Sequence, residues 1–243
     1  MKLTSQEKNI LNGEEGEVKA LAMSYLVKLG EAFDGEEMVD IAYAHMSSGS
    51  ALRTGEIEYL ESLANQGARV VVPTTSEVIP VDLCKPQTIG APQALVDEHR
   101  KLLVIQKRMG IATTYTCVPF TQGYVPAKGT YIASMESAAI IYFNSVLGAR
   151  TNRCGFFVLF AALTGKYPKI GYLLDKNRCG THRISVQAKL TGPTDFGALG
   201  YHIGALIGSG VPVLEDLCKP GQEELIMLGS ALATSGVVSM YHI

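Results

Sequence analysis

Two arginines, two asparagines, a serine and a threonine lie within the ten residues from Asn144 to Arg153. The planar guanidinium group of arginine matches the two oxygens of a carboxylate or phosphate group. This polar segment therefore predicts an anion-binding site, in which Arg150 would contact the anion directly. The alternative is that Gly148 ends a helix and that a solvated loop follows it. The candidate contacts to the anion are Asn144, Ser145, Arg150, Thr151 and Asn152.

Cys117 is the first candidate for a metal ligand, because it follows a predicted strand and stands two residues before Pro119. A thiolate at such a strand end can bind iron. The commoner role of a free cysteine is that of a small buried hydrophobic side chain. Cys154 adjoins the polar segment and is a second candidate ligand. The five cysteines form no CxxC pair, which disfavours a structural zinc site, and their odd count disfavours a disulfide framework.

Two further side chains carry groups that can handle protons. Glu136 opens a predicted helix, where its carboxylate interacts favourably with the helix dipole whether or not it also transfers protons. His45 stands at a predicted strand end, where packing or hydrogen bonding is the commoner role. The sequence holds none of the motifs GxGxxG, GxxxxGKS/T, HExxH or GxSxG. Dinucleotide-binding, P-loop, zincin and serine-hydrolase functions therefore have no support.

The segments that must position these residues alternate between helix and strand. Thr4 and Glu7 predict the capped start of a first short helix. Apolar side chains at helical spacing predict further helices at residues 14–33, 55–66, 92–109, 134–146, 157–163, 196–207 and 222–234. Apolar runs between them predict strands at residues 38–44, 68–72, 113–116, 170–174, 183–190, 211–214 and 237–243.

This alternation over the whole chain predicts a layered α/β/α fold. Apolar strands of this kind favour a sheet that helices cover on both faces. In such folds, ligands gather where loops leave the carboxyl ends of the strands. Three loops follow predicted strands in this way, namely Ser47–Ser50, Thr74–Ser76 and Cys117–Pro119. Because the last predicted strand stops at Ile243, we expect the domain to be incomplete at its C-terminus.

The composition excludes several classes of protein. A hydrophobic share of 47% is too high for a disordered chain, and a net charge of −2 provides no basic surface for nucleic acid. Apolar runs such as 138–143 and 158–163 are too short to span a membrane. The polar N-terminus does not have the pattern of a signal peptide. We therefore expect a cytoplasmic protein that binds neither nucleic acid nor membranes.

Several segments resemble the aconitase X family, and they follow one another in the same order along nearly the whole chain. The strongest match is the polar segment 144–153. The other matching segments are 3–16, 67–75, 114–120, 135–137, 162–165 and 177–178. By this resemblance, residues 1–243 are identified as the N-terminal portion of an aconitase X-type catalytic region, which can comprise two subdomains.

The resemblance implies a hydro-lyase that removes water from a small hydroxy acid with the help of an iron or iron–sulfur centre. In this family three cysteines hold the centre, and Cys117 matches the cysteine of the Thr-Cys-x-Pro motif. The remaining ligands would come from a region outside this chain. A small swivelling domain completes the active site in the family, either fused to the chain or as a separate subunit. Such a domain or subunit is therefore an expected partner.

The resemblance also assigns contacts to the substrate, with Arg150 holding a carboxylate of the hydroxy acid. The expected contacts are Thr74, Thr75, Ser137, Asn144, Ser145, Arg150, Thr151 and Asn152. Residues 135–137 and 152–155 lean toward the branch that acts on 3-hydroxyproline. Phosphomevalonate is the alternative substrate.

The sequence departs from the family pattern at a few positions. The family often has glycine where Ser48 stands, asparagine after the Thr-Thr pair where this chain has Ser76-Glu77, and an acidic residue where Phe156 stands. These departures leave two other hypotheses open. The chain can be a non-catalytic subunit or remnant that binds a partner, or an α/β module that binds a small anion.

Overall fold

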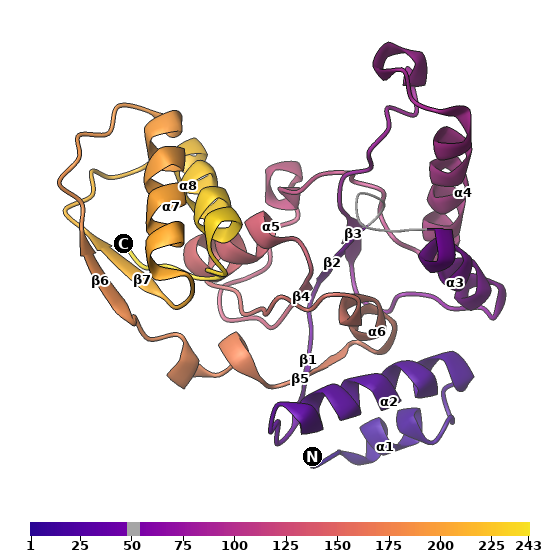
Figure 1. Ribbon diagram of the computed structural model, residues 1–243. Helices are drawn as coiled ribbons and strands as arrows, with labels where there is room; N and C mark the ends of the chain where they lie inside the picture. The colour runs from indigo at the N-terminus through magenta and orange to yellow at the C-terminus, as the bar shows by residue number, and fades with distance from the viewer. Residues whose placement is uncertain (48–53) are drawn as a thin grey trace.

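Short strands separated by helices make up the chain, as a computed structural model shows for residues 1–47 and 54–243 (Figure 1). The α-helices are α1 Ser5–Leu11, α2 Glu17–Ala32, α3 Thr54–Asn65, α4 Gln93–Met109, α5 Ser137–Tyr142, α6 Phe157–Thr164, α7 Pro193–Ile207 and α8 Gln222–Ser235. The strands are β1 Met38–Asp40, β2 Ala44–Met46, β3 Thr74–Ser76, β4 Ala133–Ser134, β5 Lys166–Pro168, β6 His182–Ser185 and β7 Pro212–Glu215. Single helical turns are η1 Pro86–Ile89, η2 Pro119–Gln122, η3 Phe143–Leu147, η4 Gly171–Leu173 and η5 Asp175–Asn177.

The central sheet is parallel and small, with its strands in the order β3–β2–β4. Its register places His45 between Thr75 and Ser134. Single parallel bridges extend the sheet at both edges, from Thr75 to Ala112 and from Ser134 to Arg153. Because all these segments run in one direction, the loops that follow them meet at the same edge of the sheet.

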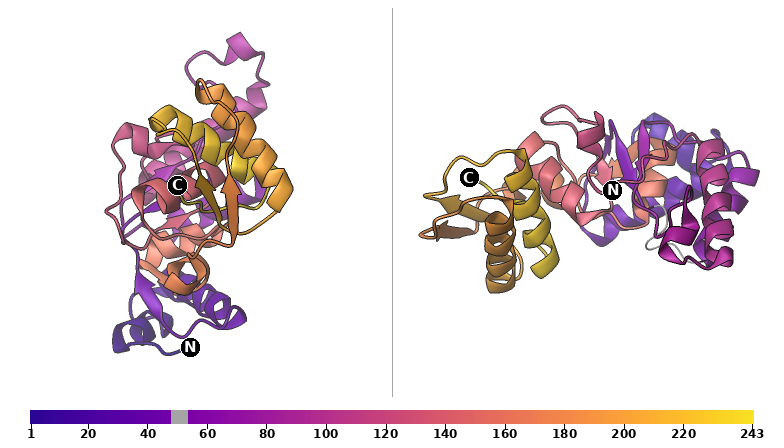
Figure 2. Two further views of the ribbon diagram at one scale, coloured as in Figure 1. Left: turned by 90° about the vertical axis from the view of Figure 1, so that its left-hand side faces the viewer. Right: turned by 90° about the horizontal axis from the view of Figure 1, so that it is seen from above.

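Three hydrophobic clusters hold the elements together. The first lies among α2, α3, α4 and α6, and the second lies among α7, α8 and β7. A third cluster surrounds Phe143, and α5 links it to the second cluster through Ile141. Figure 2 shows that β6, β7, α7 and α8 form one end of an elongated molecule. At this end α7 and α8 approach closely, since a Cβ atom at Gly200 would overlap the Leu228 carbonyl oxygen.

The predicted mixed α/β class is confirmed, and so are most of the helices. The capped start of α1 is also confirmed, because the Thr4 amide donates to Glu7 Oε2 at 2.8 Å and the Glu7 amide donates to Thr4 Oγ1 at 3.3 Å. The strands belong to three separate small sheets, since β1 pairs with β5 and β6 pairs with β7. None of the described helices combines the length and the apolar character needed to cross a membrane.

The predicted strand at 68–72 is wrong, and the predicted loop Thr74–Ser76 is itself strand β3. The Val70 amide donates to the Met109 carbonyl at 2.9 Å, and the Val71 amide donates to the Ala162 carbonyl at 2.8 Å. These carbonyls belong to α4 and α6, so the apolar run binds helices and does not pair with a strand. Val70 and Val72 pack against the first hydrophobic cluster, whereas Val71 is exposed.

The predicted strand at 113–116 is also wrong, because sheet pairing ends at Ala112. Beyond this point a side-chain hydrogen bond replaces backbone pairing, because Thr114 Oγ1 donates to the Ser76 carbonyl at 2.7 Å. Tyr115 has a φ of 49°, in the left-handed region, which a strand cannot contain. The chain therefore turns away from the sheet before it reaches Cys117.

Several other boundaries differ from the predictions. The apolar run 38–44 is divided between β1 and β2, residues 170–174 form the turn η4, and the strand predicted at 183–190 stops at Ser185. The helix predicted at 134–146 is divided into β4, α5 and η3, and in 237–243 the paired residue is His242. Strands of two to four residues carry too little periodicity to be placed from sequence. Of the predicted loop Ser47–Ser50, residues 48–50 lie outside the described residues.

Candidate functional site

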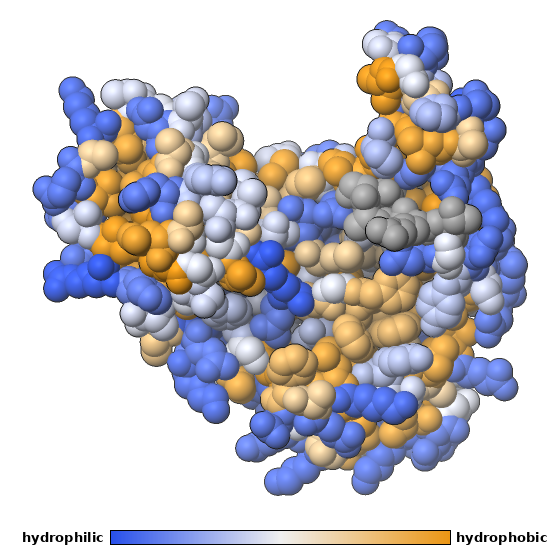
Figure 3. Space-filling model, viewed as in Figure 1, coloured by the Kyte–Doolittle hydropathy of each residue, from blue (hydrophilic) through white to orange (hydrophobic). Residues whose placement is uncertain are grey.

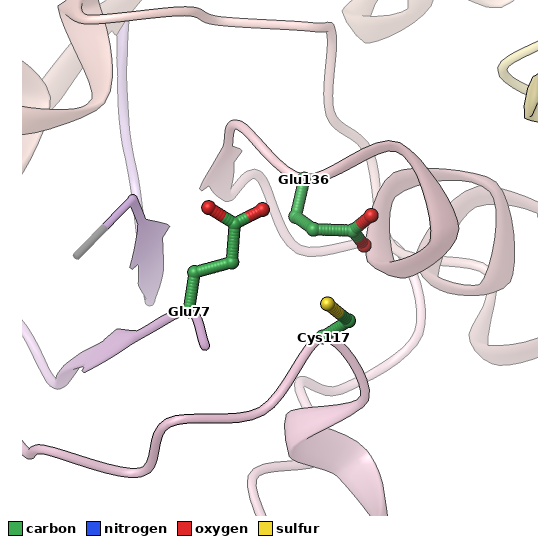
Figure 4. Close-up of side chains that lie close together, drawn as sticks. All are labelled: Glu77, Cys117 and Glu136. Atoms are coloured by element: carbon green, nitrogen blue, oxygen red, sulfur yellow. The ribbon is translucent and has the colours of Figure 1, made fainter. Parts of the chain in front are cut away.

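Glu77, Cys117 and Glu136 meet at the carboxyl edge of the central sheet (Figure 4). Glu77 follows β3, Glu136 follows β4, and Cys117 follows the segment that pairs through Ala112. One carboxylate oxygen of each glutamate and the Cys117 Sγ atom all lie within 4.8 Å of one another. The chain leaves β3 toward η1 in Figure 1, and on that side the surface is hollowed between α7–α8 and the η1–α4 projection (Figure 3).

The ladder of hydrogen bonds explains why both glutamates reach this place. The Glu77 amide donates to the Met46 carbonyl at 2.9 Å, and the Met135 amide donates to the His45 carbonyl at 3.1 Å. Pairing therefore continues for one residue beyond β3 and β4. Since side chains alternate between the faces of a sheet, Glu77 lies on the same face as Thr75, two residues earlier.

Glu136 has a structural role besides its place in this cluster. It is the N-cap of α5, and its Oε2 atom accepts the Ala139 amide at 2.6 Å. Burial raises the pKa of Glu136, while the α5 amides and the charge of Arg153 act in the opposite direction. An ionised carboxylate accepts about four hydrogen bonds or ligand contacts, and the bond from the Ala139 amide uses one of them.

Cys117 is held by the turn that precedes η2. The Val118 amide donates to Thr116 Oγ1 at 3.1 Å, and Pro119 begins η2. Burial, and then the nearby Glu136 and Glu77 carboxylates, raise the pKa of the Cys117 thiol to about 11. In the absence of a bound cation, the thiol is therefore protonated at neutral pH.

Burial and the charge of Glu136 also raise the pKa of Glu77. All three groups thus lose hydration, and neighbouring carboxylates further disfavour the ionised forms of Cys117 and Glu77. A cation among them would remove both penalties. The arrangement is suited to holding a metal ion, or to retaining and releasing protons at an enclosed surface.

A second row of polar side chains lies in the sheet itself. It consists of His45, Thr75 and Ser134, and the last two stand two residues before Glu77 and Glu136. His45 Nδ1 and Thr75 Oγ1 are 2.9 Å apart, and the Tyr43 hydroxyl also contacts Thr75 Oγ1. His45 Nε2 and Ser134 Oγ are buried and have no hydrogen-bond partner within the described part of the chain. Burial lowers the pKa of His45 to about 4, so its imidazole is neutral at physiological pH.

The polar segment 144–153 lies apart from this cluster over most of its length and binds neighbouring backbone. Asn144 donates to the Thr151 and Ser239 carbonyls at 3.0 Å each, and its Oδ1 atom accepts Arg178 Nη1 at 3.0 Å. Asn152 donates to the Ile170 carbonyl at 3.0 Å. The segment therefore joins the first hydrophobic cluster to the part of the chain that carries β6 and β7.

Other predicted substrate contacts have protein partners as well. The Thr74 hydroxyl donates to the Val72 carbonyl at 2.9 Å, and Ser145 Oγ accepts the Tyr241 amide at 2.9 Å. The Thr151 hydroxyl donates to the Asn152 carbonyl at 3.1 Å. The predicted contact that lies at the cluster is Ser137, which is hydrogen-bonded to Glu136 and lowers its pKa against the larger effect of burial.

Arg150 donates from Nη1 to the Leu173 carbonyl at 3.4 Å and also has a charged partner. Its Nη2 atom lies 2.6 Å from Asp175 Oδ1, and the Asp175 side chain is 86% exposed. An exposed ion pair of this kind is weak and exchangeable. A ligand carboxylate could therefore replace Asp175 without disturbing the core, and anion binding by Arg150 stays a prediction.

Sequence reasoning recognised Cys117 and Glu136 but missed Glu77 as a member of the cluster. Glu77 was noted only as a departure from a family pattern. Its spacing of two residues from Thr75 could have identified it. This spacing indicates a shared face of the sheet only when residues 74–76 are recognised as a strand.

The cysteines do not gather in this chain. Cys154 is buried and its Sγ atom lies 3.3 Å from the Asn152 carbonyl oxygen, whereas Cys84, Cys179 and Cys218 are exposed. Among the described residues, Cys117 is the one cysteine in a group with metal-binding geometry. The other described cysteines therefore do not join Cys117 in a three-cysteine set.

Comparison with known families gives two matches along the chain. Residues 1–176 match the model described as Aconitase X first domain, and residues 180–243 match the model described as Aconitase X second domain. The boundary falls after η5, where the chain passes to the β6–β7 unit.

Curated relatives cover the entire chain. It is 39% identical over 244 residues to the phosphomevalonate dehydratase large subunit of Methanothermobacter thermautotrophicus, a match that covers 99% of this chain and 61% of the relative. It is 30% identical over 249 residues to the cis-3-hydroxy-L-proline dehydratase of Hypocrea jecorina, covering 100% of this chain and 42% of the relative.

The fold matches a solved structure closely. The crystal structure of Thermococcus kodakaraensis aconitase X in its holo-form superposes with a TM-score of 0.91 and 34% sequence identity. The match covers 100% of this chain and 61% of that chain. The chain thus spans about three fifths of the length of these large-subunit relatives.

Proposed function

This chain belongs to the aconitase X family, and we propose that it forms the metal-holding part of a hydro-lyase that dehydrates a small hydroxy acid. The observation that carries the proposal is the meeting of Cys117 with two carboxylates at the carboxyl edge of the sheet. Ligands of α/β proteins bind at this edge. The family relationship supplies the reaction class, and the cluster supplies a place for it.

An iron centre fits the cluster in part, because Cys117 offers one thiolate and faces the two carboxylates. When bound there, iron would act as a Lewis acid on the leaving hydroxyl group of the substrate. The residues of this chain would hold the centre, restrict water around it through their burial, and keep Ser137 beside it. Further thiolate ligands would come from outside this chain, since its other cysteines lie elsewhere.

We favour phosphomevalonate over 3-hydroxyproline as the type of substrate. Phosphomevalonate dehydratase large subunits are up to 39% identical to this chain, whereas the two hydroxyproline dehydratases are 30% and 32% identical. This preference differs from the lean that residues 135–137 and 152–155 suggested. The relatives are named as large subunits, which supports a small subunit as the partner that completes the site. Arg150 is proposed to bind an anionic group of the substrate in exchange for Asp175.

The proposal can be tested by supplying the remaining two fifths of the protein. This chain is fused to the residues that follow the matched region in the Methanothermobacter thermautotrophicus large subunit, and the fusion is mixed with that organism's small subunit and iron. We expect the mixture to dehydrate phosphomevalonate, and we expect Cys117→Ser to abolish the reaction. A folded, iron-loaded assembly that turns over neither phosphomevalonate nor 3-hydroxyproline would refute the proposal.

A further inference from the structure

We propose that a pocket between α2, α6 and β5 binds a small neutral molecule that is mainly hydrocarbon and carries a hydroxyl group. These three elements pack against one another (Figure 1), and the pocket between them has a volume of about 480 Å³. The proposal goes beyond the hydro-lyase function, because it holds whether or not the completed protein dehydrates a hydroxy acid.

The wall of this pocket is mainly apolar, which is typical of small-molecule sites with volumes of roughly 300–1,000 Å³. Phe33, at the end of α2, is 65% exposed and stands at the mouth of the pocket, whereas Tyr167 of β5 is 2% exposed and lies at its bottom. The apolar and aromatic side chains that line the pocket are Leu29, Phe33, Phe156, Phe157, Tyr167 and Ile170.

Two of the aromatic walls are held in place without a ligand. The rings of Phe156 and Phe157, at the start of α6, make edge-to-face contacts with the Phe160 ring at centroid distances of 5.9 and 6.1 Å. The Phe156 ring also lies 6.0 Å from the Tyr59 ring. Because these contacts already restrict the side chains, little conformational entropy is lost when a ligand binds.

The pocket lies on the face of the central sheet opposite the Glu77–Cys117–Glu136 cluster. Arg153 bridges to Ser134 and shares its face, so Cys154, the next residue, points to the other face. There Cys154 is part of the first hydrophobic cluster and lines the pocket. The family pattern often has an acidic residue where Phe156 stands. The aromatic wall is therefore a feature of this chain, and an anionic hydroxy acid does not account for it.

Two polar groups meet at the bottom of the pocket. Cys154 Sγ donates to the Asn152 carbonyl at 3.3 Å, and the side chains of Cys154 and Tyr167 are hydrogen-bonded to each other. Because the thiol hydrogen is used on Asn152, the Tyr167 hydroxyl donates to the sulfur, and its oxygen can still accept a hydrogen bond. A hydroxyl group on the ligand would donate that bond.

Charge and volume narrow the class of ligand further. The charged residue in the wall is Arg153, whose Nε and Nη2 atoms donate to Ser239 Oγ and to the Ala233 and Val238 carbonyls. The pocket therefore favours a neutral ligand. An apolar cavity of about 150 Å³ holds one benzene molecule, so about 480 Å³ has room for a molecule of two fused rings. The alcohol 2-naphthol combines this size with a neutral charge and a hydroxyl group.

The test is a calorimetric titration of the 243-residue chain with 2-naphthol. We expect one molecule per chain, a dissociation constant of about 0.1 mM or lower, and a negative change in heat capacity from the burial of apolar surface. Phe33→Ser removes the wall at the mouth and should raise the dissociation constant at least about fivefold. Tyr167→Phe should weaken the binding of 2-naphthol by about fivefold. The same variant should bind naphthalene as the parent does, because naphthalene has no hydroxyl group to donate.

Leu206→Ser is the matched control for Phe33→Ser, since Leu206 is 69% exposed on α7 and lies outside the pocket. This variant should bind 2-naphthol as the parent does. Circular dichroism confirms that each variant is folded, and Phe33→Ser remains informative if Tyr167→Phe does not fold.

Three results would overturn the proposal. The first is the absence of saturable binding by the parent, and the second is an equal loss of affinity in Phe33→Ser and Leu206→Ser. The third is a dimer of the parent that dissociates in Phe33→Ser, because a second copy of the chain would then fill the pocket. Since the readout is the heat of binding, failure of the dehydration assay leaves this result unaffected.

Discussion

The Sγ atom of Cys117 and a carboxylate oxygen of Glu136 lie within 4.8 Å of each other, although one residue precedes η2 and the other caps α5. The two residues belong to segments that leave the sheet on opposite sides of β2, because the segment before Cys117 bridges to β3 at Ala112 and Glu136 follows β4. A change in the charge of one group should therefore be measurable at the other.

The first prediction concerns the reactivity of the Cys117 thiol. Because its pKa is raised to about 11, iodoacetamide should modify it at pH 8 more slowly than the exposed Cys84, by roughly tenfold or more. The rate at Cys117 should still be rising at pH 10. Mass spectrometry of the metal-free chain measures both sites, and equal rates at pH 8 would contradict the prediction.

The same measurement on Glu136→Gln tests the coupling between the two groups. Removing the negative charge of Glu136 removes one cause of the raised pKa of Cys117. The modification rate of Cys117 at pH 8 should increase by roughly two- to tenfold. The rate at Cys84 serves as the internal reference. An unchanged rate at Cys117 would show that the carboxylate does not act on the thiol.

The second role of Glu136, as the cap of α5, predicts a loss of stability when the side chain is truncated. Glu136→Ala leaves the Ala139 amide without its acceptor, and the free energy of unfolding should fall by about 1 kcal/mol. Glu136→Gln retains a side-chain oxygen and should lose less. Urea denaturation compares the two variants, and a larger loss in the glutamine variant would argue against the capping role.

Asn144 is expected to be essential for stability and not only for ligand binding. Its side chain donates to two carbonyls and accepts from the Thr151 amide and from Arg178, all in a buried setting. Asn144→Ala would leave several of these partners unpaired, which should cost at least about 2 kcal/mol of unfolding free energy. Chemical denaturation gives this value directly, and a loss below about 0.5 kcal/mol would contradict it.

Arg150 provides the contrasting case. Its ion pair with the exposed Asp175 contributes little to folding, so Arg150→Ala should lower the unfolding free energy by less than about 1 kcal/mol. In the completed enzyme the same variant should raise KM for the substrate. Unfolding of the variant under conditions where the parent is folded would show that the role of Arg150 is structural.

His45 predicts a loss of stability in acid. The pKa of His45 is lowered by burial to about 4 in the folded chain, from about 6.5 in the unfolded chain. Between these values the unfolded chain binds more protons, so the full stability is present above pH 6.5 and is lost as the pH falls to 4. The loss should reach about 3 kcal/mol.

Denaturation of the parent and of His45→Gln over this pH range measures the contribution. The parent should lose more stability than the variant as the pH falls. Parallel pH profiles of the two proteins would mean that His45 does not titrate as its burial indicates.

The amino-acid sequence by itself determined the α/β class and the long helices, because periodic apolar positions over three or more turns leave few alternatives. The positions of α4 and α8 were predicted to within one residue at each end, and α7 begins three residues earlier than predicted. Residue chemistry also singled out Cys117, since a thiol that follows an apolar run is uncommon enough to notice.

Only the tertiary structure decided which polar residues form the cluster. Residues 68–72 have the pattern of a strand, yet the amides of Val70 and Val71 bind α4 and α6. Because the strand was predicted there and not at Thr74–Ser76, the spacing of Thr75 and Glu77 on one face of the sheet was not recognised. The polar side chains of 144–152 are of the types that bind anions, yet most of them bind backbone groups from distant segments. An amide or a guanidinium group has the same chemistry toward a substrate as toward a carbonyl group of its own chain, and only the three-dimensional arrangement determines which of the two it meets.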